Sequence, residues 1–483
     1  MKKFVAAVDL GASSGRVCIG YLEAGELRIE EVRRFSHESV TEFGALHWQW
    51  THIVNEVEVG LRKAKERGEL LSVGVDFWAV DYGLLDSDLA LISTPYCYRD
   101  SRADPFFKSI PERLTKEYIY EKTGIQYLYF NTIYQLAASN AVGELDGIQQ
   151  FLMLPDLLNN HFCGSLTNDV TNASTTQLLN ARTRDWDWEL IDEVGLPRGI
   201  FPKIHKPGDK LGVITGLDDL DGAQVIAVAS HDTGSAVAGT PLDPNAHSAY
   251  ISSGTWSLVG MELKEPVTNA KTLEYNITNE LGAEDTVRFI KNVAGLWLIE
   301  ESLRYWKKQG LTLKITDLVV EASKLPRARC LIDATDPKYT KPGPVPEWIA
   351  EYAVATGQYV PQTPTEFALA IFESLALAYR QVIHELEDSS GKDVTEINIV
   401  GGGSANALLN QLTSDAVGVK VTSGPSEATA LGNIIVQLIS LGELKNLQEG
   451  RALIAKSSNQ SIFQPQVGQD WEKLAERLKG YSQ

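Results

Sequence analysis

Short apolar stretches separated by turn-forming residues dominate the first 80 residues of the chain. Residues 4–8, 17–22 and 71–75 form apolar runs, and residues 27–32 alternate apolar with polar side chains. The runs predict buried strands and the alternation predicts a half-exposed strand, with a turn at the small residues 11–15. Later runs of the same kind predict further strands at residues 150–154, 224–229 and 396–400.

Helical spacing appears between these runs. Apolar residues at positions 53, 57, 61 and 64 predict an amphipathic helix over residues 51–66, and a longer stripe predicts a helix over residues 365–387. Two further helices are expected at residues 406–417 and 427–441. Residues 337–364 contain six of the 19 prolines, which predicts an irregular region. Strands and helices in this succession indicate an α/β protein with mixed sheets.

The opening pattern recurs near the middle of the chain. Residues 249–252 and 257–261 predict two strands joined by the small-residue turn Ser253-Gly254-Thr255. A chain of 483 residues is long enough for two to four domains of about 100–200 residues. The recurrence favours two domains of related topology, residues 1–242 and 243–483.

The charge balance limits the partners that can be expected. The chain has 44 Lys and Arg residues against 63 Asp and Glu residues, a net charge of −19. Nucleic acids and anionic membranes would repel such a surface, so neither is an expected partner. The first apolar run ends at Asp9, too early for a signal peptide, and the four cysteines form no CxxC pair. We expect a soluble, cytoplasmic protein with reduced thiols.

Residues 9–16 read Asp-Leu-Gly-Ala-Ser-Ser-Gly-Arg and follow the first strand. A carboxylate at a strand end, then small residues and an arginine, suits phosphate binding beside a carboxylate-held cation. The spacing matches neither a Walker A loop nor a dinucleotide fingerprint. A plain hairpin turn is the alternative. Ser253-Gly254-Thr255 has the same character and could form a second phosphate loop.

Ser230-His231-Asp232-Thr233 directly follows the strand predicted at residues 224–229. Ligands bind α/β sheets at the carboxyl ends of strands, so Asp232 could act as a general base for a hydroxyl group. His231 and Thr233 would then orient the substrate. The alternative is a helix N-cap at this position, which gives no reason for the neighbouring histidine.

Two further segments could bind ring-shaped ligands. Gly401-Gly402-Gly403 lacks every Cβ, so adenine could lie against its backbone, with residues 427–432 as the opposite wall. Residues 76–82 place aromatic and acidic side chains after the strand at residues 71–75, a combination that binds sugars. The alternatives are a flexible loop for the glycines and an ordinary core tryptophan for Trp78.

The order of these segments resembles that of the FGGY carbohydrate kinases, members of the actin/hexokinase/Hsp70 ATPase superfold. The resemblance extends over nearly the whole chain and is closest to kinases of L-rhamnulose, for which residues 9–16 and 230–233 together are quite specific. It implies two ribonuclease H-like domains, each a mixed five-stranded sheet flanked by helices, with a catalytic cleft between them. Other matching segments are residues 98–102, 130–136, 171–178, 252–258, 291–297 and 400–403.

The resemblance also implies an activity, the transfer of the γ-phosphoryl group of ATP to O1 of L-rhamnulose in the presence of Mg²⁺. The first domain would hold the sugar site and first phosphate loop, and the second domain the second phosphate loop and adenine site. Asp232 falls on the family's proton acceptor and Asp9 on its Mg²⁺-holding carboxylate. The remaining matches are sugar contacts at Trp78, Ala79, His231, Asp232, Thr233 and Asn292, and ATP contacts at Ala12, Ser13, Ser14, Gly15, Arg16, Thr255, Glu300 and Gly402.

This sequence departs from the family pattern at a few positions. Ala79 replaces a glycine of some members and adds a methyl group to the sugar pocket, and Glu300 replaces an ATP-contacting glutamine. Thr413 and Val417 stand where some members carry cysteines, which excludes a disulfide there.

Two other functions remain open at this point. One is an FGGY kinase of another ketose, such as L-fuculose or L-ribulose. The other is an ATP-binding switch of the same superfold, which would not need the sugar-directed carboxylate of Asp232.

Overall fold

The computed structural model describes residues 2–481, apart from the side chains of residues 218, 337 and 340, and the chain forms two compact units. The first unit comprises Met1–Pro241, Glu262–Phe289 and Ala428–Ser457. The second comprises Leu242–Met261, Ile290–Glu427 and Ser458–Gln483. Each unit is therefore assembled from three separate stretches of the chain. No helix within residues 2–481 is long and apolar enough to cross a membrane.

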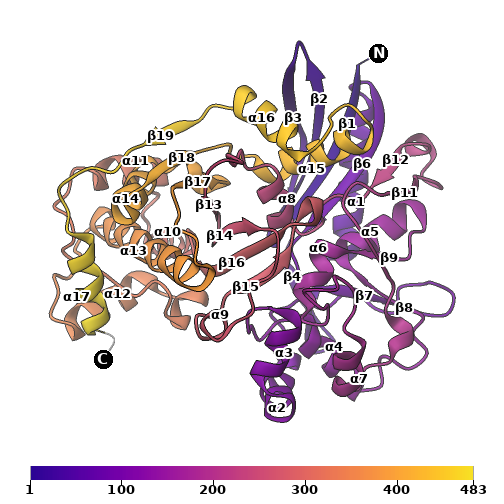
Figure 1. Cartoon of the computed structure of the whole chain (residues 1–483), viewed down its shortest axis with the longest axis horizontal. Helices are drawn as coiled ribbons and strands as arrows, with labels where there is room; N and C mark the ends of the chain where they lie inside the picture. Colours follow the sequence, from indigo (N-terminus) through magenta and orange to yellow (C-terminus); the bar gives the residue numbers. More distant parts are fainter. Residues whose placement is uncertain (1, 482–483) are drawn as a thin grey trace. The chain divides into compact units, whose positions relative to one another are not determined.

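A six-stranded sheet with the order β11-β12-β6-β1-β2-β3 forms the centre of the first unit (Figure 1). β1 pairs antiparallel with β2 and parallel with β6, and β12 pairs parallel with β6. The strands predicted near the start of the chain are confirmed. The bounds are β1 Lys3–Gly11, β2 Ser14–Glu23, β3 Glu26–Ser36, β6 Glu69–Phe77, β11 Lys210–Val213 and β12 Gln224–Ile226.

A seven-stranded sheet has the order β15-β16-β14-β13-β17-β18-β19. β13 pairs antiparallel with β14 and parallel with β17, and β17 pairs parallel with β18. The bounds are β13 Ser248–Ser253, β14 Trp256–Leu263, β15 Thr278–Leu281, β16 Val287–Ala294, β17 Glu396–Val400, β18 Lys420–Ser423 and β19 Ser461–Phe463. Three small two-stranded sheets join β4 (Ser39–Glu42) to β5 (Ala45–Trp48), β7 (Tyr82–Leu85) to β8 (Gln150–Met153), and β9 (Thr167–Asp169) to β10 (Lys203–His205).

The two large sheets share a five-stranded core. The core has the strand order β12-β6-β1-β2-β3 in the first sheet and β18-β17-β13-β14-β16 in the second. In the first sheet, β1 pairs antiparallel with β2 and parallel with β6. In the second sheet, β13 pairs antiparallel with β14 and parallel with β17 in the same way. The predicted repetition of topology is therefore confirmed. The prediction of five strands in each sheet matches this core but misses the edge strands β11, β15 and β19, which are only three or four residues long.

Helices cover the sheets. Those in the first unit are α1 Trp50–Lys65, α2 Asp104–Leu114, α3 Lys116–Thr123, α4 Thr132–Ala141, α5 Leu154–Cys163, α6 Val170–Ala173, α7 Trp188–Val194, α8 Asp232–Ala238, α9 Ala270–Glu274, α15 Ala428–Ser440 and α16 Leu447–Ser457. Those in the second are α10 Trp297–Lys308, α11 Ile315–Ala322, α12 Val345–Ala355, α13 Pro364–Ser390, α14 Ala407–Val417 and α17 Trp471–Tyr481.

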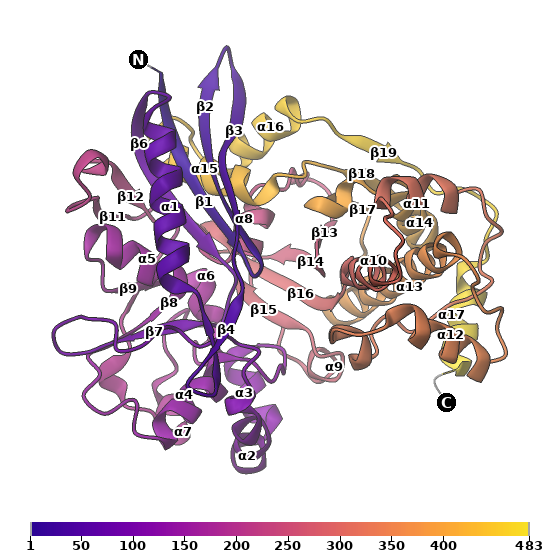
Figure 2. The ribbon, with the colours of Figure 1, turned by 180° about the vertical axis from the view of Figure 1, so that it is seen from behind.

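Alternate residues of β1 point to opposite faces of the first sheet, as the two-residue period of a strand requires. Val8 packs in the cluster that contains Val57 of α1, which lies in front of the sheet in Figure 2. Ala7 packs in a different cluster with Ile434 of α15. Asp9 has the same parity as Ala7 and therefore lies on the α15 face of the sheet.

The region rich in prolines, residues 337–364, is not irregular throughout. α12 lies within it, with Pro344 at the N-cap and Pro346 in the first turn, and α13 begins at Pro364. The first-turn N–H groups of a helix have no partner inside the helix, so proline loses no hydrogen bond there. The prediction made from proline content was therefore wrong for α12.

The helices α8 and α15 cross with their backbones in contact. A Cβ atom on Gly432 would lie 1.8 Å from the carbonyl oxygen of Ser235, and one on Gly239 would lie 2.0 Å from that of Ala428. Glycine is required at both positions because no side-chain movement could relieve these contacts. Residues 428–432 therefore form a helix contact in the first unit.

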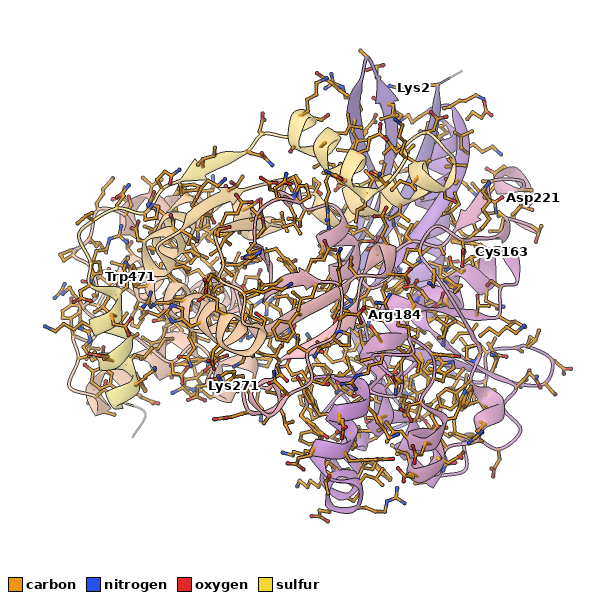
Figure 3. All side chains as sticks on the ribbon, viewed as in Figure 1. Lys2, Cys163, Arg184, Asp221, Lys271 and Trp471 are labelled. Atoms are coloured by element: carbon orange, nitrogen blue, oxygen red, sulfur yellow. The ribbon has the colours of Figure 1, made fainter. Side chains whose placement is uncertain are left out.

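All four cysteines are free thiols. Cys18, Cys97 and Cys330 are buried, and Cys163 at the end of α5 is partly exposed (Figure 3). Burial raises the pKa of the thiols of Cys18, Cys97 and Cys330 to about 12, so these thiols stay protonated near neutral pH.

Candidate functional site

The residues expected to bind phosphate form the hairpin turn between β1 and β2. Asp9 and Arg16 lie opposite each other in this hairpin, and Oδ2 of Asp9 accepts hydrogen bonds from Nε of Arg16 at 2.8 Å and Nη2 at 2.6 Å. At the tip, Ser13 is exposed, whereas Ala12 and Ser14 are half-buried. The segment is thus a tight hairpin, as the alternative interpretation held, with a tip that a ligand can reach.

Gly15 is the buried member of this hairpin. A Cβ atom there would lie 2.2 Å from Leu10 Cδ2 and 2.4 Å from Phe35 Cζ, so the close packing of the hairpin requires glycine. Any ligand contact of Gly15 would have to be made through its backbone.

His37, which the sequence analysis did not identify, connects this hairpin to Trp78. Its Nε2 donates to the carbonyl oxygen of Gly11 at 2.8 Å, and its ring stacks on Trp78 with centroids 5.1 Å apart. Burial lowers the pKa of His37, although the hydrogen bond to Gly11 favours the protonated ring. A single histidine 26 residues from its partner gave no local pattern that could have been recognised.

The aromatic and acidic side chains of residues 76–82 are buried. Trp78 is only 5% exposed, and its Nε1 donates to Oδ2 of Asp81 at 3.0 Å. Nε1 of Trp48 donates to the same oxygen at 2.6 Å. Asp76 is fully buried and accepts a 2.6 Å hydrogen bond from Asn433. Both carboxylates thus accept internal hydrogen bonds, whereas Ala79 beside them is half-exposed.

Asp9, Asp76 and Asp232 form one electrostatically linked group on the α15 side of the first sheet. Asp9 and Asp76 are register partners in the parallel pair β1–β6. Burial, and then the charge of Asp9, raises the pKa of Asp76 well above the ordinary value. Burial also raises the pKa of Asp232, with a further contribution from Asp9 and an opposing one from His231. A carboxylate with a raised pKa is a stronger proton acceptor.

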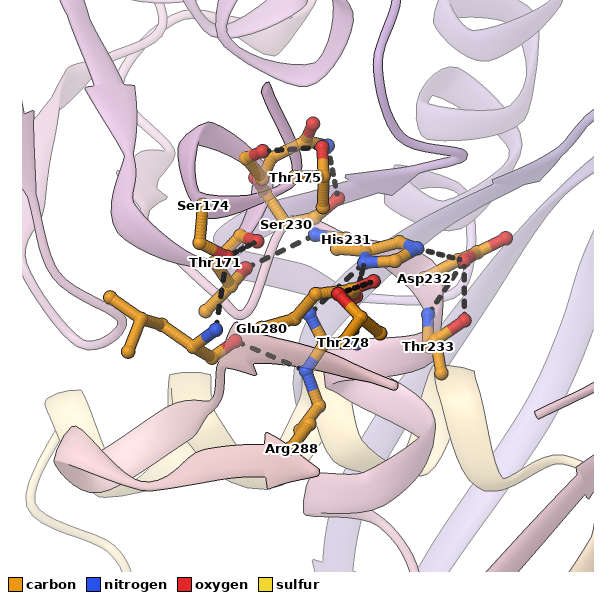
Figure 4. A network of polar contacts seen from close by, with 12 residues as sticks. Thr171, Ser174, Thr175, Ser230, His231, Asp232, Thr233, Thr278, Glu280 and Arg288 are labelled. Carbon is orange, nitrogen blue, oxygen red and sulfur yellow. Dashed lines mark hydrogen bonds and ion pairs between the residues drawn. The ribbon is translucent and has the colours of Figure 1, made fainter. Parts of the chain in front are cut away.

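Asp232 is the first residue of α8, and its carboxylate is held through a single oxygen (Figure 4). Oδ1 accepts hydrogen bonds from the Thr233 N–H at 2.6 Å and from the Thr233 hydroxyl at 3.1 Å, and Nε2 of His231 lies 3.4 Å from it. The Asp232 side chain remains 29% exposed. The N-cap position belongs to His231, so Asp232 does not act as the cap that the alternative interpretation assumed.

Two buried residues absent from the sequence analysis contact the other side of the His231 ring. Arg288 Nη2 lies 3.0 Å from His231 Nδ1, and Glu280 Oε2 lies 3.1 Å from the same nitrogen (Figure 4). Burial alone would raise the pKa of Glu280, but Arg288 and His231 lower it below its ordinary value. Both residues lie on strands, where a polar side chain in the sequence gives no sign of such a partner.

In the second unit, the turn after β13 is attached to the start of α10. The carbonyl oxygen of Thr255 accepts hydrogen bonds from Gly295 N–H at 3.2 Å and Trp297 N–H at 3.1 Å. A Cβ atom on Gly295 would lie 2.6 Å from the backbone of Trp256, which explains the glycine. Thr255 itself is half-buried.

The glycine run after β17 packs on the same turn. A Cβ atom on Gly403 would lie 2.0 Å from Oγ of Ser253, whereas a Cβ atom on Gly402 would have nothing within 4 Å. Gly402 is exposed and therefore offers open backbone to a ligand. The structure thus brings together the two segments of the second unit that were expected to bind ATP.

The remaining expected contacts in the second unit are Asn292 and Glu300. Asn292 is half-buried in β16, and Glu300 is half-buried in the first turn of α10. Burial raises the pKa of Glu300, although Arg304 opposes this effect.

The comparison with protein families accounts for nearly the whole chain. Residues 4–239 match the N-terminal domain of the FGGY family of carbohydrate kinases, and residues 249–441 match the C-terminal domain of the same family. The chain belongs to the FGGY family of carbohydrate kinases. The family predicted from the sequence is therefore confirmed, and with it a kinase that uses ATP to phosphorylate a carbohydrate.

Curated relatives of this FGGY kinase include several rhamnulokinases. The rhamnulokinase of Ligilactobacillus salivarius is 40% identical over 481 residues, covering 99% of this chain and 98% of the relative. That of Enterococcus faecalis is 40% identical, with 96% and 94% covered, and that of Bacteroides thetaiotaomicron is 39% identical, with 98% of each chain covered.

Solved structures of other kinases share the fold. Xylulose kinase from Lactobacillus acidophilus aligns with a TM-score of 0.79 at 17% identity, covering 99% of this chain and 96% of that one. Glycerol kinase from Plasmodium falciparum, solved with ADP, aligns with a TM-score of 0.78 at 14% identity, covering 99% and 97%. The predicted α/β fold with two mixed sheets flanked by helices is therefore confirmed.

Proposed function

We propose that this FGGY kinase transfers the γ-phosphoryl group of ATP to O1 of L-rhamnulose. The observation that carries this proposal is the likeness to rhamnulokinases along almost the whole chain. Such a kinase would act in the cytoplasm, where ATP is available, and four free thiols suit that reducing compartment.

Asp232 is the proposed general base. Thr233 donates twice to Oδ1 of Asp232, and no residue within residues 2–481 donates to Oδ2. Oδ2 would accept the proton of the O1 hydroxyl as that oxygen attacks the γ-phosphorus. The raised pKa of Asp232 supports this role because it makes the carboxylate a stronger base. General-base catalysis of this kind typically contributes about 10²–10⁴-fold.

The proposed sugar contacts of the first unit lie around Asp232, and Asn292 is a proposed contact from the second unit. His231 and Thr233 flank it in sequence, and Ala79 presents a half-exposed methyl group after β6. The small exposed part of Trp78 would supply apolar surface to the sugar ring, and Asn292 would supply an amide. The methyl group of Ala79 would narrow the site relative to family members with glycine.

Each unit has its own proposed ATP contacts. In the first unit, Ala12, Ser13, Ser14, Gly15 and Arg16 would bind phosphate oxygens, and the exposed hairpin tip supports this role. In the second unit, Thr255 would contact a phosphate and the open backbone of Gly402 would lie against adenine. Glu300 would lie near the nucleotide at the start of α10.

Asp9 is the proposed holder of Mg²⁺. Within residues 2–481, no group of three or more His, Cys, Asp or Glu side chains could hold a metal ion. Mg²⁺ commonly uses only one or two protein carboxylates and takes its other ligands from phosphates and water, so Asp9 fits this need. The neighbouring Oδ1 of Asp76 is buried without a hydrogen-bond partner, which leaves an additional acceptor near Asp9. When bound, Mg²⁺ neutralises phosphate charge during transfer.

A panel of acceptor sugars tests the proposal. ADP release would be measured by a coupled assay with L-rhamnulose, L-fuculose, L-ribulose, D-xylulose, glycerol and no sugar. We expect kcat/KM for L-rhamnulose to exceed the next value by about tenfold or more, and NMR of the product to place the phosphate on O1. A higher kcat/KM for another ketose would refute the substrate. ADP release without a phosphorylated sugar would refute the sugar-directed base.

A further inference from the structure

A buried ion pair lies directly behind His231 (Figure 4). Nη1 of Arg288 is 3.1 Å from Oε2 of Glu280, and the Arg288 side chain is completely buried. Burying two charges costs several kcal/mol per ion before their attraction is counted, so such a pair is a poor source of stability. A role in positioning another group is a better reason for its presence.

The contacts of the pair define where the His231 proton lies. A guanidinium group only donates hydrogen bonds, so Nη2 of Arg288 donates to Nδ1 of His231 at 3.0 Å. Oε2 of Glu280 also lies 3.1 Å from Nδ1, but among the described residues this oxygen has no hydrogen-bond partner. The hydrogen-bond geometry therefore makes Nδ1 the acceptor of Arg288 and leaves the ring proton on Nε2. Nε2 is the nitrogen that lies 3.4 Å from Oδ1 of Asp232. The opposite tautomer would point an N–H of the ring at an N–H of Arg288.

The pair is itself fixed by neighbouring strands. Nε of Arg288 donates to the carbonyl oxygen of Leu281 at 3.0 Å, and the N–H of Leu281 donates to Oγ of Ser174 at 2.9 Å. The positive charge of Arg288 lowers the pKa of Glu280 against the effect of burial and so favours its charged form. Glu280 therefore offsets the charge of Arg288, which could not be buried alone.

We propose that Arg288 and Glu280 are positioning residues that hold the His231 ring with its Nε2–H directed at Oδ1 of Asp232. Thr233 and His231 then occupy Oδ1 together, and Oδ2 is the oxygen left for the sugar hydroxyl. The inference rests on the proposed role of Asp232 as the general base. Its chemical consequence is that the pair affects turnover without touching either substrate.

Other charged groups also face Asp232 and must stay constant in any test. Asp9 on β1 and Asp76 on β6 both interact electrostatically with Asp232. Variants at Arg288 and Glu280 leave both of these carboxylates in place. Any change in turnover would therefore come from the side of His231.

The first experiment removes the pair without leaving a buried charge, in the double variant Arg288→Met with Glu280→Gln. We expect a folded enzyme whose kcat falls on the order of 10–100-fold, by analogy with the loss of a hydrogen-bond partner that orients a metal-binding histidine. KM for L-rhamnulose should change by less than about threefold, because the pair makes no ground-state contact with the sugar. Unchanged kcat in the folded double variant would overturn the proposal.

A double-mutant cycle separates positioning from a general structural effect. In the His231→Gln variant, removing Arg288 and Glu280 should lower kcat by no more than about twofold, because the two residues affect turnover only by holding the His231 ring. The same loss with and without His231 would overturn the proposal. Arg288→Lys, which keeps the charge, is the second variant, and we expect its kcat to lie between those of wild type and the double variant.

The tautomer can be observed without turnover. In protein labelled with ¹⁵N-histidine, the His231 signals are those that vanish in the His231→Gln variant. We expect an unprotonated Nδ1 and a protonated Nε2 in the wild type, and a protonated Nδ1 would overturn the proposal. If L-rhamnulose were not phosphorylated at all, the proposed function would fail, and this measurement would still decide the arrangement of His231.

Discussion

Oδ1 of Asp169 accepts hydrogen bonds from both the main-chain N–H and the hydroxyl group of Ser230, each at 3.0 Å. Asp169 is fully buried, and the same oxygen accepts the N–H of Thr171, so that Asp169 caps α6. One carboxylate thus joins two stretches of chain 61 residues apart. Because Ser230 lies two residues before Asp232, this contact fixes the strand end from which the proposed base projects.

Replacing Asp169 should affect both stability and turnover. Asp169→Ala leaves several buried donors without an acceptor, at about 1–3 kcal/mol for each, so we expect a loss of at least about 3 kcal/mol in the free energy of unfolding. Turnover of the folded fraction should fall as well. Urea unfolding and the coupled assay measure the two effects. Asp169→Asn keeps an acceptor oxygen at this position, so its free energy of unfolding should fall much less than that of Asp169→Ala. Equal losses of stability in the two variants would contradict the role of Asp169 as the acceptor of these hydrogen bonds.

Asp232→Asn should separate binding from catalysis. The amide keeps the size of the side chain and can still accept from Thr233, but it cannot take up the hydroxyl proton. We expect normal unfolding, retained binding of ATP and sugar by calorimetry, and a fall in kcat of about 10²–10⁴-fold. Asp192→Asn, at an exposed aspartate paired with Arg198, is the matched control and should leave kcat unchanged. Wild-type turnover in Asp232→Asn would rule out the proposed base.

Gly432→Ala should disturb the crossing of α8 and α15. The added methyl group would lie 1.8 Å from a backbone oxygen, and only a shift of one helix could make room for it. Overpacking of this kind costs about 1–3 kcal/mol or more. We expect a lower midpoint of thermal unfolding and, because Asp232 begins α8, a lower kcat. Gly199→Ala, where a Cβ atom has nothing within 4 Å, is the control, and the prediction fails if the two variants are equally stable.

Asp81 should make stability depend on pH. Burial raises its pKa to about 6 from the ordinary 3.8, although hydrogen bonds from Trp78 and Trp48 oppose this. Between about pH 4 and 6, the folded chain therefore binds a proton that the unfolded chain does not. This proton stabilises the folded chain at low pH, and the stabilisation is lost as the pH rises through 6. At 1.36 kcal/mol per pKa unit, the full shift from 3.8 to about 6 corresponds to a change of about 3 kcal/mol in the free energy of unfolding.

The Asp81→Asn variant isolates this contribution. The free energy of unfolding of Asp81→Asn should lack this part of the pH dependence, so that it rises relative to that of wild type by roughly 2.4 kcal/mol between pH 4 and pH 7. Urea unfolding of both proteins at the two pH values provides the measurement. A difference between the proteins that does not change with pH would contradict the raised pKa.

The sequence predicted the parts of the fold that depend on local pattern. The apolar runs before Asp9 and Ser253 are strands because their residues are buried on both faces of a sheet. The longest helix was recognisable from its stripe, and Thr363 and Glu366 form the capping box at its start. The strand β19 escaped prediction because three residues are too few to establish a period.

The site was predictable only where its residues are consecutive. Residues 230–233 place the proposed base and a neighbouring hydroxyl group directly after a strand, within one short motif. Residues 9–16 likewise place a carboxylate, small residues and an arginine together in the hairpin proposed to bind phosphate. Arg288 and Glu280 reach His231 from strands 57 and 49 residues further along, and their positions have no distinguishing pattern. Long-range partners of this kind depend on how strands meet in space.

The division of the first unit into three stretches has a consequence for how the chain folds during its synthesis. α15 contributes Ile434 to the same core as Ala7 of β1, and Asn433 bonds to Asp76, so the earliest strands lack a large part of their cover until α15 exists. The ribosome makes Ala428–Ser457 after both other stretches of the first unit, Met1–Pro241 and Glu262–Phe289. The nascent N-terminal sheet therefore stays incomplete until residues 428–457 have been made. A chain shortened before residue 428 would expose the α15 face of β1 to chaperones and proteases.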